Sequence, residues 1–187
     1  MPKTGHLYII RHGRTDWNNL KKLQGRTDIP LNDEGRNMAD EARSEYKDIH
    51  FDVCYSSPLV RATETARILL SERNIPIITD SRLTEMGFGI FEGAENAYKN
   101  PSASIYNFFI APERYIADKS AESFEELFER TGAFLKEVAY PLVEQGKSVL
   151  IVGHGAMNSS IICHVRKIPL ARFWEAGIEN CKLKKLI

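Results

Sequence analysis

The sequence predicts an α/β fold, a three-layer α/β/α sandwich in which a mostly parallel central sheet lies between two layers of helices. Short apolar runs typical of buried strands alternate along the chain with segments that carry apolar residues at helical spacing. The 187 residues also suit one folding unit, because a domain usually has about 150 residues. We therefore expect a single domain over residues 1–187.

Five segments are candidate strands. They are residues 7–10, 51–55, 75–78, 149–152 and, at the end of the chain, 181–187. Each of the first four is a short apolar run that leads into a polar or glycine-containing turn and then into a helical pattern. This order is typical of a sheet with helices on both faces.

Three helices are expected between these strands. Asn32 can cap a helix whose first turn carries two carboxylates, and this helix should run to about Lys47. Residues 62–73 are rich in good helix formers and place apolar side chains on one face, which should pack on the sheet. Ser123 begins an S-x-x-E capping box ahead of a third amphipathic helix, which Pro141 should kink or end.

Residues 93–122 interrupt this order with an irregular pattern that contains Pro101, Pro112 and scattered aromatic residues. Long segments without regular structure in a domain are often functional. We interpret this one as a lid-like excursion over the core that covers an active site.

Charge and hydropathy exclude several classes of partner. Lysine and arginine together number 25, and so do aspartate and glutamate, so the chain lacks the overall positive field that binds nucleic acid or anionic membranes. Its apolar runs fall far short of the roughly 20 residues that span a bilayer, and no secretory signal is visible. We therefore expect a cytoplasmic protein with neither a nucleic-acid nor a membrane partner. Cys54, Cys163 and Cys181 suit buried thiols better than a disulfide framework or a zinc site.

Three of the candidate strands end in residues suited to phosphate. Arg11 and His12 follow the first strand, and Arg61 follows the second after a short turn. His154 and Gly155 follow the fourth. Ligands of open α/β sheets bind beyond the carboxyl ends of the strands, so parallel neighbours would bring two arginines and two histidines into one pocket. Each guanidinium offers a rigid fork of donors, and glycine beside a histidine lets a ligand approach the backbone, which together predict an anion site.

Each motif is weak when it is taken alone, because an isolated histidine is more often a packed or surface residue than a catalyst. The motifs become specific when their order and spacing are considered together. They comprise RHGRTDWN at 11–18 followed by Gln24 and Gly25, SSPLVRATETA at 56–66, a third segment at 85–93 and VGHG at 152–155. In this order they resemble the histidine phosphatase superfamily, in its phosphoglycerate-mutase-like branch, over nearly the whole chain.

The resemblance implies a histidine-phosphatase fold and a reaction through a phosphorylated histidine, without a metal ion or another cofactor. His12 matches the nucleophile, and Glu85 matches the proton donor. The residues that match the stabilisers of charge on the phosphoryl oxygens are Arg11, Arg61 and His154. To attack, His12 must be neutral, and the neighbouring arginines disfavour its protonated form.

The resemblance also implies secondary contacts to the substrate from Asn18, Gln24 and Gly25, with Gly155 beside the last histidine. Asn18 and Gln24 could equally be turn-forming polar residues. Where relatives often carry an arginine after the last histidine-glycine pair, this chain has Ser159, which alters local pairing and removes no reactive group.

The main division within this family lies between phosphatases, which release phosphate to water, and mutases, which return it to another hydroxyl. Residues 93–122 lack the adjacent arginine pair that phosphoglycerate mutases present, and instead carry five aromatic residues, among them Phe108 and Phe109, that suit an organic moiety. The sequence therefore favours a phosphatase acting on a small phosphorylated metabolite. A phosphomutase and a non-catalytic module that binds phosphorylated ligands remain alternatives, and the oligomeric state is open, a homodimer included.

Overall fold

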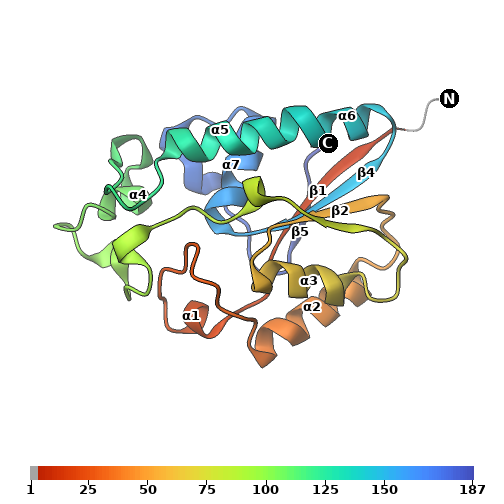
Figure 1. Ribbon diagram of the computed structural model, residues 1–187, viewed down its shortest axis with the longest axis horizontal. Coiled ribbons are helices and arrows are strands. Elements are labelled where there is room, and N and C mark those ends of the chain that lie inside the picture. The colour runs from red at the N-terminus through yellow and green to blue at the C-terminus, as the bar shows by residue number, and fades with distance from the viewer. Residues whose placement is uncertain (1–3) are drawn as a thin grey trace.

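A central sheet organises residues 4–187, the part of the chain that the computed structural model describes (Figure 1). Its strands are β1 His6–Arg11, β2 Val53–Ser56, β3 Ile77–Thr79, β4 Ser148–Gly153 and β5 Leu183–Lys185, in the order β3-β2-β4-β1-β5. The first four run parallel, and β5 pairs antiparallel with β1. The mostly parallel sheet that the sequence predicts is therefore confirmed.

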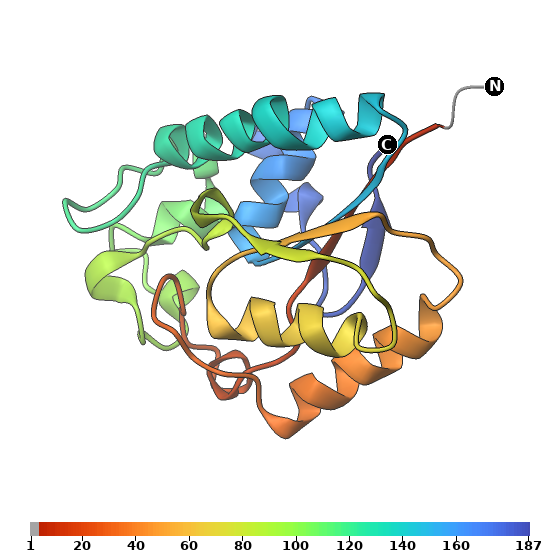
Figure 2. The same ribbon diagram turned by 45° about the vertical axis from the view of Figure 1, so that its right-hand side comes forward.

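Helices cover both faces of the sheet and give the predicted three layers (Figures 1 and 2). The helices are α1 Asp16–Asn19, α2 Asp33–Glu45, α3 Val60–Leu69, α4 Tyr106–Ile110, α5 Phe124–Phe134, α6 Tyr140–Glu144 and α7 Gly155–Arg166. Helices α2 and α3 lie on one face, and α5, α6 and α7 lie on the other. Short 3-10 turns occur at Ser81–Leu83, Gly89–Phe91, Ala97–Lys99, Pro112–Arg114 and Leu170–Ala176.

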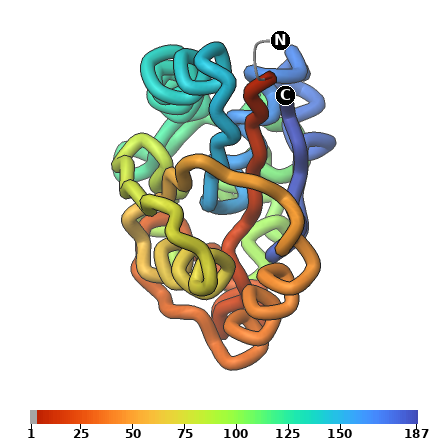
Figure 3. The backbone as a smooth tube through the Cα atoms, turned by 90° about the vertical axis from the view of Figure 1, so that its right-hand side faces the viewer, coloured from red at the N-terminus to blue at the C-terminus, as the bar shows by residue number. Residues whose placement is uncertain are grey.

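The five predicted strands are present with shifted boundaries, and two of the shifts have clear causes. The strand predicted at 75–78 begins only after Pro76, because proline has no backbone N–H to donate to the sheet. The strand predicted at 181–187 shrinks to β5, since Cys181 has a left-handed φ of 55°, outside the strand region. Figure 3 shows β5 in dark blue beside β1 in red, at one edge of the sheet.

Apolar side chains of the central strands alternate between the two faces. Leu7 and Ile9 of β1 pack in the cluster shared with α5 and α7, whereas Ile10 packs in the cluster shared with α2 and α3. Strand β4, between β1 and β2, is buried along its whole length. Burial on both faces explains why β4 contains a continuous apolar run, as is typical of strands in parallel sheets.

The helix starts show the predicted caps. Asn32 Oδ1 accepts a hydrogen bond from the N–H of Gly35 at 2.8 Å, and Ser123 forms the predicted capping box with the glutamate three residues later. Helix α2 ends at Glu45 and not at the predicted Lys47.

Two further helix predictions need correction. The helix predicted at 62–73 spans Val60–Leu69 and so begins two residues earlier and ends four residues earlier than predicted. The N–H of Val60 donates to Asp28 Oδ1 at 2.8 Å. Pro141 does not end the third helix, because a π-helical turn over Leu135–Ala139 continues α5 into α6. Pro141 lies just after this π-helical turn, where the regular hydrogen-bond pattern that a proline interrupts is already changed.

Residues 93–122 contain α4 and short turns, and they lie beyond the carboxyl ends of the parallel strands (Figure 2). Phe108 of α4 is 1% exposed, and its ring contacts those of Phe88, Phe124 and Trp174 at centroid distances of 4.9, 5.4 and 5.0 Å. These contacts come from three separate parts of the chain. Phe108 therefore packs the excursion onto the core.

Replacing Phe108 with alanine should lower the free energy of unfolding by about 3–5 kcal/mol, because the deletion leaves a cavity among aromatic rings. Ile110→Ala is the matched control, since Ile110 lies in the same helix but is 58% exposed, and it should change stability by less than about 0.5 kcal/mol. Urea denaturation of both variants and the wild type measures the difference. Equal effects of the two substitutions would contradict the packing role of Phe108.

Candidate active site

The carboxyl ends of β1, β2 and β4 bring the predicted phosphate-binding residues together. Arg11 ends β1, and His12 follows it. Arg61 lies in the first turn of α3 after β2, and His154 precedes α7 after β4. The three strands are neighbours in the sheet, and the ring centroids of His12 and His154 are 5.1 Å apart. One cavity of about 210 Å³ is lined by Arg11, His12, Arg61 and Glu85.

His12 is buried, and its hydrogen bond identifies the tautomer. Its Nδ1 lies 2.6 Å from the carbonyl oxygen of Gly13. A carbonyl oxygen can only accept, so Nδ1 carries the hydrogen and Nε2 of the neutral ring is unprotonated. Burial, followed by the charges of Arg61 and Arg11, lowers the pKa of His12 well below its ordinary value. The ring is therefore a neutral base with a free nitrogen lone pair.

His154 has the opposite tautomer. Arg61 Nε donates to His154 Nδ1 at 3.3 Å, so the hydrogen of the neutral ring is on Nε2. Burial and the charge of Arg61 lower the pKa of His154 well below its ordinary value. Its Nε2 is buried and has no hydrogen-bond partner among the described residues. His154 thus presents a buried donor that no group of residues 4–187 uses.

Arg61 is fully buried and is held by the loop after α1. Its Nη1 donates to the carbonyl oxygen of Thr27 at 2.9 Å, and its Nη2 donates to that of Gly25 at 2.7 Å. Burial lowers the pKa of Arg61 to about 10, so the group stays positive near neutral pH. Gly25 has a φ of 56°, and a Cβ there would lie 2.2 Å from a carboxylate oxygen of Glu92. The predicted Gly25 is therefore required by the backbone that holds Arg61.

Arg11 adds a second unpartnered donor. Its Nε is buried without a hydrogen-bond partner among residues 4–187, while its Nη1 lies 3.5 Å from the carbonyl oxygen of Ile178. Burial lowers the pKa of Arg11, and the charge of Glu85 raises it. Buried polar groups in proteins are normally paired. The unpaired nitrogens of Arg11 and His154 therefore indicate a ligand with several acceptor oxygens.

Glu85 is held at the N-terminus of α7 by backbone N–H groups. Its Oε2 accepts from Gly155 at 2.9 Å and from Ala156 at 3.2 Å. Its Oε1 accepts from Met157 at 2.9 Å and from Met86 at 2.9 Å. The carboxylate therefore satisfies donors that a helix start leaves unpaired, at the positive end of the helix dipole. Gly155, predicted to contact the ligand, lines the cavity but uses its N–H on Glu85.

Asn18 and Gln24, for which the sequence leaves two roles open, both contact Thr15. Both line the cavity. Asn18 Oδ1 accepts from the N–H of Thr15 at 3.1 Å and so completes a capping box for α1. Gln24 Oε1 lies 3.0 Å from Thr15 Oγ1. Thr15 therefore fixes the positions of both side chains at the cavity.

Gly13 is needed for packing beside the first histidine. A Cβ at Gly13 would lie 2.3 Å from the carbonyl oxygen of Gly35, in the first turn of α2. The lack of a side chain therefore lets the chain after β1 pack against α2.

Several residues that line the cavity were not predicted from the sequence, namely Lys22, Leu23, Phe88, Ala156 and Trp174. For Lys22 the sequence holds a weak indication, since it lies two positions before the predicted Gln24. For Trp174 the sequence holds no indication, because it reaches the cavity only through the fold, where its Nε1 donates to the carbonyl oxygen of Phe108 at 2.8 Å. Phe108 and Phe109, which the sequence identified as candidates for substrate contact, also line the cavity.

A second cavity of about 580 Å³ adjoins the first and shares Arg11, Gly155 and Trp174 with it. Ser159, the departure from the family pattern, lines this cavity. Its Oγ is buried and has no hydrogen-bond partner among the described residues. Since serine is much shorter than arginine, the departure leaves room beside the first cavity.

Other features of the described chain concern metals, membranes and thiols. Among residues 4–187, no group of three or more His, Cys, Asp or Glu residues could hold a metal ion. No helix in that range is long and apolar enough to cross a bilayer.

Cys54, Cys163 and Cys181 are free and buried, as predicted. Burial raises the pKa of Cys54 to about 12 and that of Cys163 to about 11, as expected of unreactive thiols.

Comparisons with known proteins cover nearly the whole chain. The chain is 36% identical to the uncharacterized phosphatase PhoE of Bacillus subtilis (strain 168) over 161 residues. The matched region covers 84% of this chain and 75% of that protein. The chain is 30% identical to a 2,3-bisphosphoglycerate-dependent phosphoglycerate mutase of Cytophaga hutchinsonii, over 87% of this chain and 78% of the mutase.

A solved structure shares the fold. Phosphoserine phosphatase from Entamoeba histolytica, in complex with 3-phosphoglyceric acid, superposes with a TM-score of 0.83 at 26% identity, over 97% of this chain and 89% of that one. That relative binds a small phosphorylated metabolite. Residues 7–187 also match the family model of the histidine phosphatase superfamily (branch 1). The chain therefore belongs to the histidine phosphatase superfamily, in its phosphoglycerate-mutase-like branch.

Proposed function

We propose that the protein hydrolyses small phosphomonoesters through a phosphohistidine intermediate on His12. The observation that carries this proposal is the state of the His12 ring, which is buried and neutral and has an unprotonated Nε2 beside two guanidinium groups. Donors for the phosphoryl oxygens are supplied by Arg11, Arg61 and His154. Fixed donors of this kind stabilise the charge on the oxygens during transfer.

The proposed reaction has two steps. In the first, His12 Nε2 bonds to phosphorus while the bond from phosphorus to the ester oxygen breaks, and the electron pair of that bond stays on the oxygen. Glu85 in its acid form gives this oxygen a proton, and an alcohol leaves. In the second step a water oxygen bonds to phosphorus, the nitrogen–phosphorus bond breaks, and Glu85 takes the proton of the water. Inorganic phosphate leaves, and both side chains return to their starting states.

The walls of the cavity favour an organic group on the substrate. The 210 Å³ cavity adjoins the second cavity, with which it shares Arg11, Gly155 and Trp174. Beyond the phosphate donors the walls include Phe109 and Trp174, whose rings stack with centroids 6.2 Å apart. Because α4 supplies part of this wall, we propose that residues 93–122 act as a lid over the substrate.

A phosphatase is favoured over a mutase, although relatives of the chain include both. Residues 93–122 contain no adjacent arginine pair, and Lys22, a further cation of the cavity, is paired with Glu95 at 3.6 Å. A mutase acting on a phosphorylated acid needs cations for the carboxylate as well as for the phosphate. We therefore expect release of inorganic phosphate in assays with phosphoglycerates and no interconversion of their isomers.

A phosphoenzyme on His12 should accumulate or be trapped on rapid acid-free quenching with labelled substrate. Because the bond is a phosphoramidate, the label should survive base and be lost in acid. Peptide mapping locates the label, and His12→Ala should abolish both the label and hydrolysis of a chromogenic phenyl phosphate in the presence of a chelator. Label on a serine or on His154 would overturn the assignment, and an inactive wild type would favour a binding module.

Glu85→Gln should reduce kcat/KM by roughly 10²- to 10⁴-fold, the usual range for the loss of a general acid. The loss should be largest for strongly basic leaving groups, because these need a proton most. A series of phosphomonoesters with leaving groups of different basicity measures it. The same loss for every leaving group would count against Glu85 as the acid.

The stability of the unliganded protein should fall as the pH drops below about 6.5, the ordinary pKa of histidine. The folded-state pKa values of His12 and His154 are lowered, so in this window the unfolded chain binds protons that the folded chain does not. Each histidine should contribute a slope of up to about 1.4 kcal/mol per pH unit, lost as pH falls from 6.5 towards the lowered pKa. Chemical denaturation between pH 7.5 and 4.5 checks this. His154→Gln should show the shallower slope, and an unchanged slope would contradict a neutral His154.

A further inference from the structure

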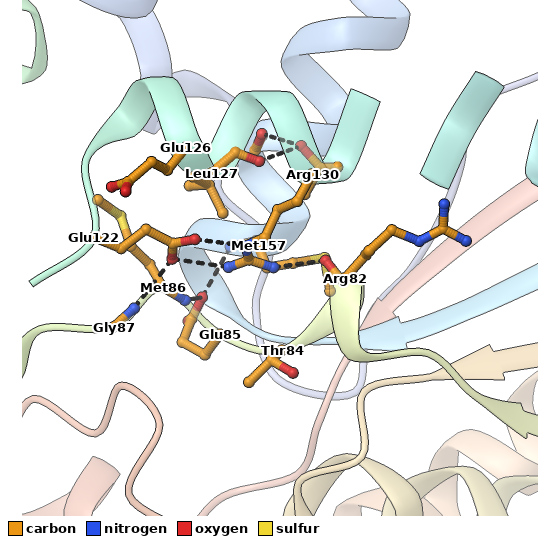
Figure 4. A network of polar contacts seen from close by, with 12 residues as sticks. Arg82, Thr84, Glu85, Met86, Gly87, Glu122, Glu126, Leu127, Arg130 and Met157 are labelled. Atoms are coloured by element: carbon orange, nitrogen blue, oxygen red, sulfur yellow. Dashed lines mark hydrogen bonds and ion pairs between the residues drawn. The ribbon is translucent and has the colours of Figure 1, made fainter. Parts of the chain in front are cut away.

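Glu122 and Arg130 form a largely buried ion pair next to the segment that carries Glu85 (Figure 4). Arg130 Nε donates to Glu122 Oε1 at 2.6 Å, and Arg130 Nη2 donates to Glu122 Oε2 at 3.0 Å. The exposed fractions of the two side chains are 16% for Arg130 and 7% for Glu122. Two parallel bonds of this kind fix the relative orientation of both groups.

The same pair bonds to the main chain on both sides of Glu85. Arg130 Nη1 donates to the carbonyl oxygen of Arg82 at 2.6 Å. Gly87 donates its N–H to Glu122 Oε2 at 3.2 Å, and the N–H of Glu122 donates to the carbonyl oxygen of Gly87 at 2.8 Å. Figure 4 shows Arg130 reaching from α5 to a point between Glu122 and Arg82. The chain is therefore fixed before and after the proposed acid.

Contacts of Glu122 extend this connection to two other parts of the site. Glu122 is the last residue of the excursion at 93–122, and its Oε1 lies 3.2 Å from Nη2 of Arg26. The Nε of Arg26 is 3.5 Å from the carbonyl oxygen of Glu85. Arg26 directly follows Gly25, whose carbonyl oxygen holds a guanidinium of the phosphate pocket. The ion pair thus joins the proposed lid, the acid segment and the loop beneath the phosphate.

Stability alone is a weak explanation for this pair. Removing two charges from water is costly, so a buried ion pair often adds little net stability compared with apolar residues of similar size. A catalytic group, in contrast, must be held within about 0.5 Å of its productive position. Glu85 lies on irregular chain after a 3-10 turn, where no helix or sheet ladder holds its main chain. The bonds from Glu122 and Arg130 supply that support.

We infer that Glu122 and Arg130 are positioning residues for Glu85, which hold its main chain at the place from which the carboxyl group reaches the leaving oxygen. The inference rests on the proposed role of Glu85 as the general acid. The N-terminus of α7 holds the carboxylate, and the ion pair holds the backbone. Loss of the pair should therefore impair proton transfer more than phosphate binding, because the loop beneath the phosphate keeps its hydrogen bonds to Arg61.

The test compares kcat/KM for phosphomonoesters whose leaving groups differ in basicity, because basic leaving groups need the proton and good ones do not. Arg130→Lys keeps the positive charge but loses the bidentate fork. It should lower kcat/KM by about 10- to 100-fold for basic leaving groups and by much less for good ones. Glu122→Gln should show the same pattern. In a Glu85→Gln background, Arg130→Lys should cause little additional loss, since it acts through the missing acid.

Glu137→Gln is the matched control. Glu137 lies in the π-helical turn that continues α5, and its Oε2 accepts from Nη1 of the Arg82 side chain at 2.6 Å. Like Arg130, Glu137 contacts Arg82, but Glu137 contacts the side chain, whereas Arg130 contacts the carbonyl oxygen. The Glu137→Gln substitution therefore removes a nearby charge without touching the backbone before Glu85. Its kcat/KM should equal that of the wild type for every leaving group.

A double variant, Glu122→Leu with Arg130→Met, guards against loss of folding in the single variants, because replacing both charges with apolar residues is often tolerated. It should show the same dependence on the leaving group. Equal losses for all leaving groups, or wild-type kinetics in the Arg130 and double variants, would overturn the inference while Glu85→Gln still showed its own dependence. If Glu85→Gln showed no such dependence, the acid role and the inference would both be wrong.

Discussion

The buried guanidinium of Arg61 constrains the rest of the site. A charge removed from water is costly unless its donors are paired, and Arg61 donates to two carbonyl oxygens of the loop after α1 and to Nδ1 of His154. The first two bonds require the left-handed backbone of Gly25, and the third sets the tautomer of His154. One side chain from α3 therefore ties together a loop that follows β1 and the residue that follows β4.

The pocket holds positive charges and hydrogen-bond donors that the protein does not fully balance. Arg11 and Arg61 bring two positive charges, and burial keeps both histidines neutral. Glu85 is the acidic group of the pocket, and its oxygens already accept hydrogen bonds from backbone N–H groups. A phosphoryl group offers both the missing charge and the missing acceptor oxygens. Donors that are already in place before the ligand arrives need no reorganisation during transfer, which is how such sites lower a barrier.

Local signals explain why much of this arrangement could be predicted from the sequence. The apolar runs of the strands and the helix caps at Asn32 and Ser123 depend on residues a few positions apart. The rule that ligands bind beyond the carboxyl ends of parallel strands needs only the order of the strands. The contact of Glu85 with the N-terminus of α7, and the part of the cavity wall formed by Trp174, depend on contacts between distant segments. The periodicity of apolar residues does not encode such contacts. Gly13 shows the limit clearly, because its close packing against Gly35 of α2 is a contact that the residues around Gly13 do not indicate.

The two halves of the site are held in different ways. His12 extends the sheet, since its N–H donates to the carbonyl oxygen of Gly153 at 2.9 Å, so the proposed nucleophile shares the rigidity of β1 and β4. Glu85 has no such ladder, and its position is built from the start of α7 and from the ion pair of Glu122 and Arg130. Glu122 also ends the segment at 93–122, so a movement of that segment would act on the backbone that carries Glu85. The proposed geometry of proton transfer therefore depends on the proposed lid, whereas the position of the proposed nucleophile depends on the sheet.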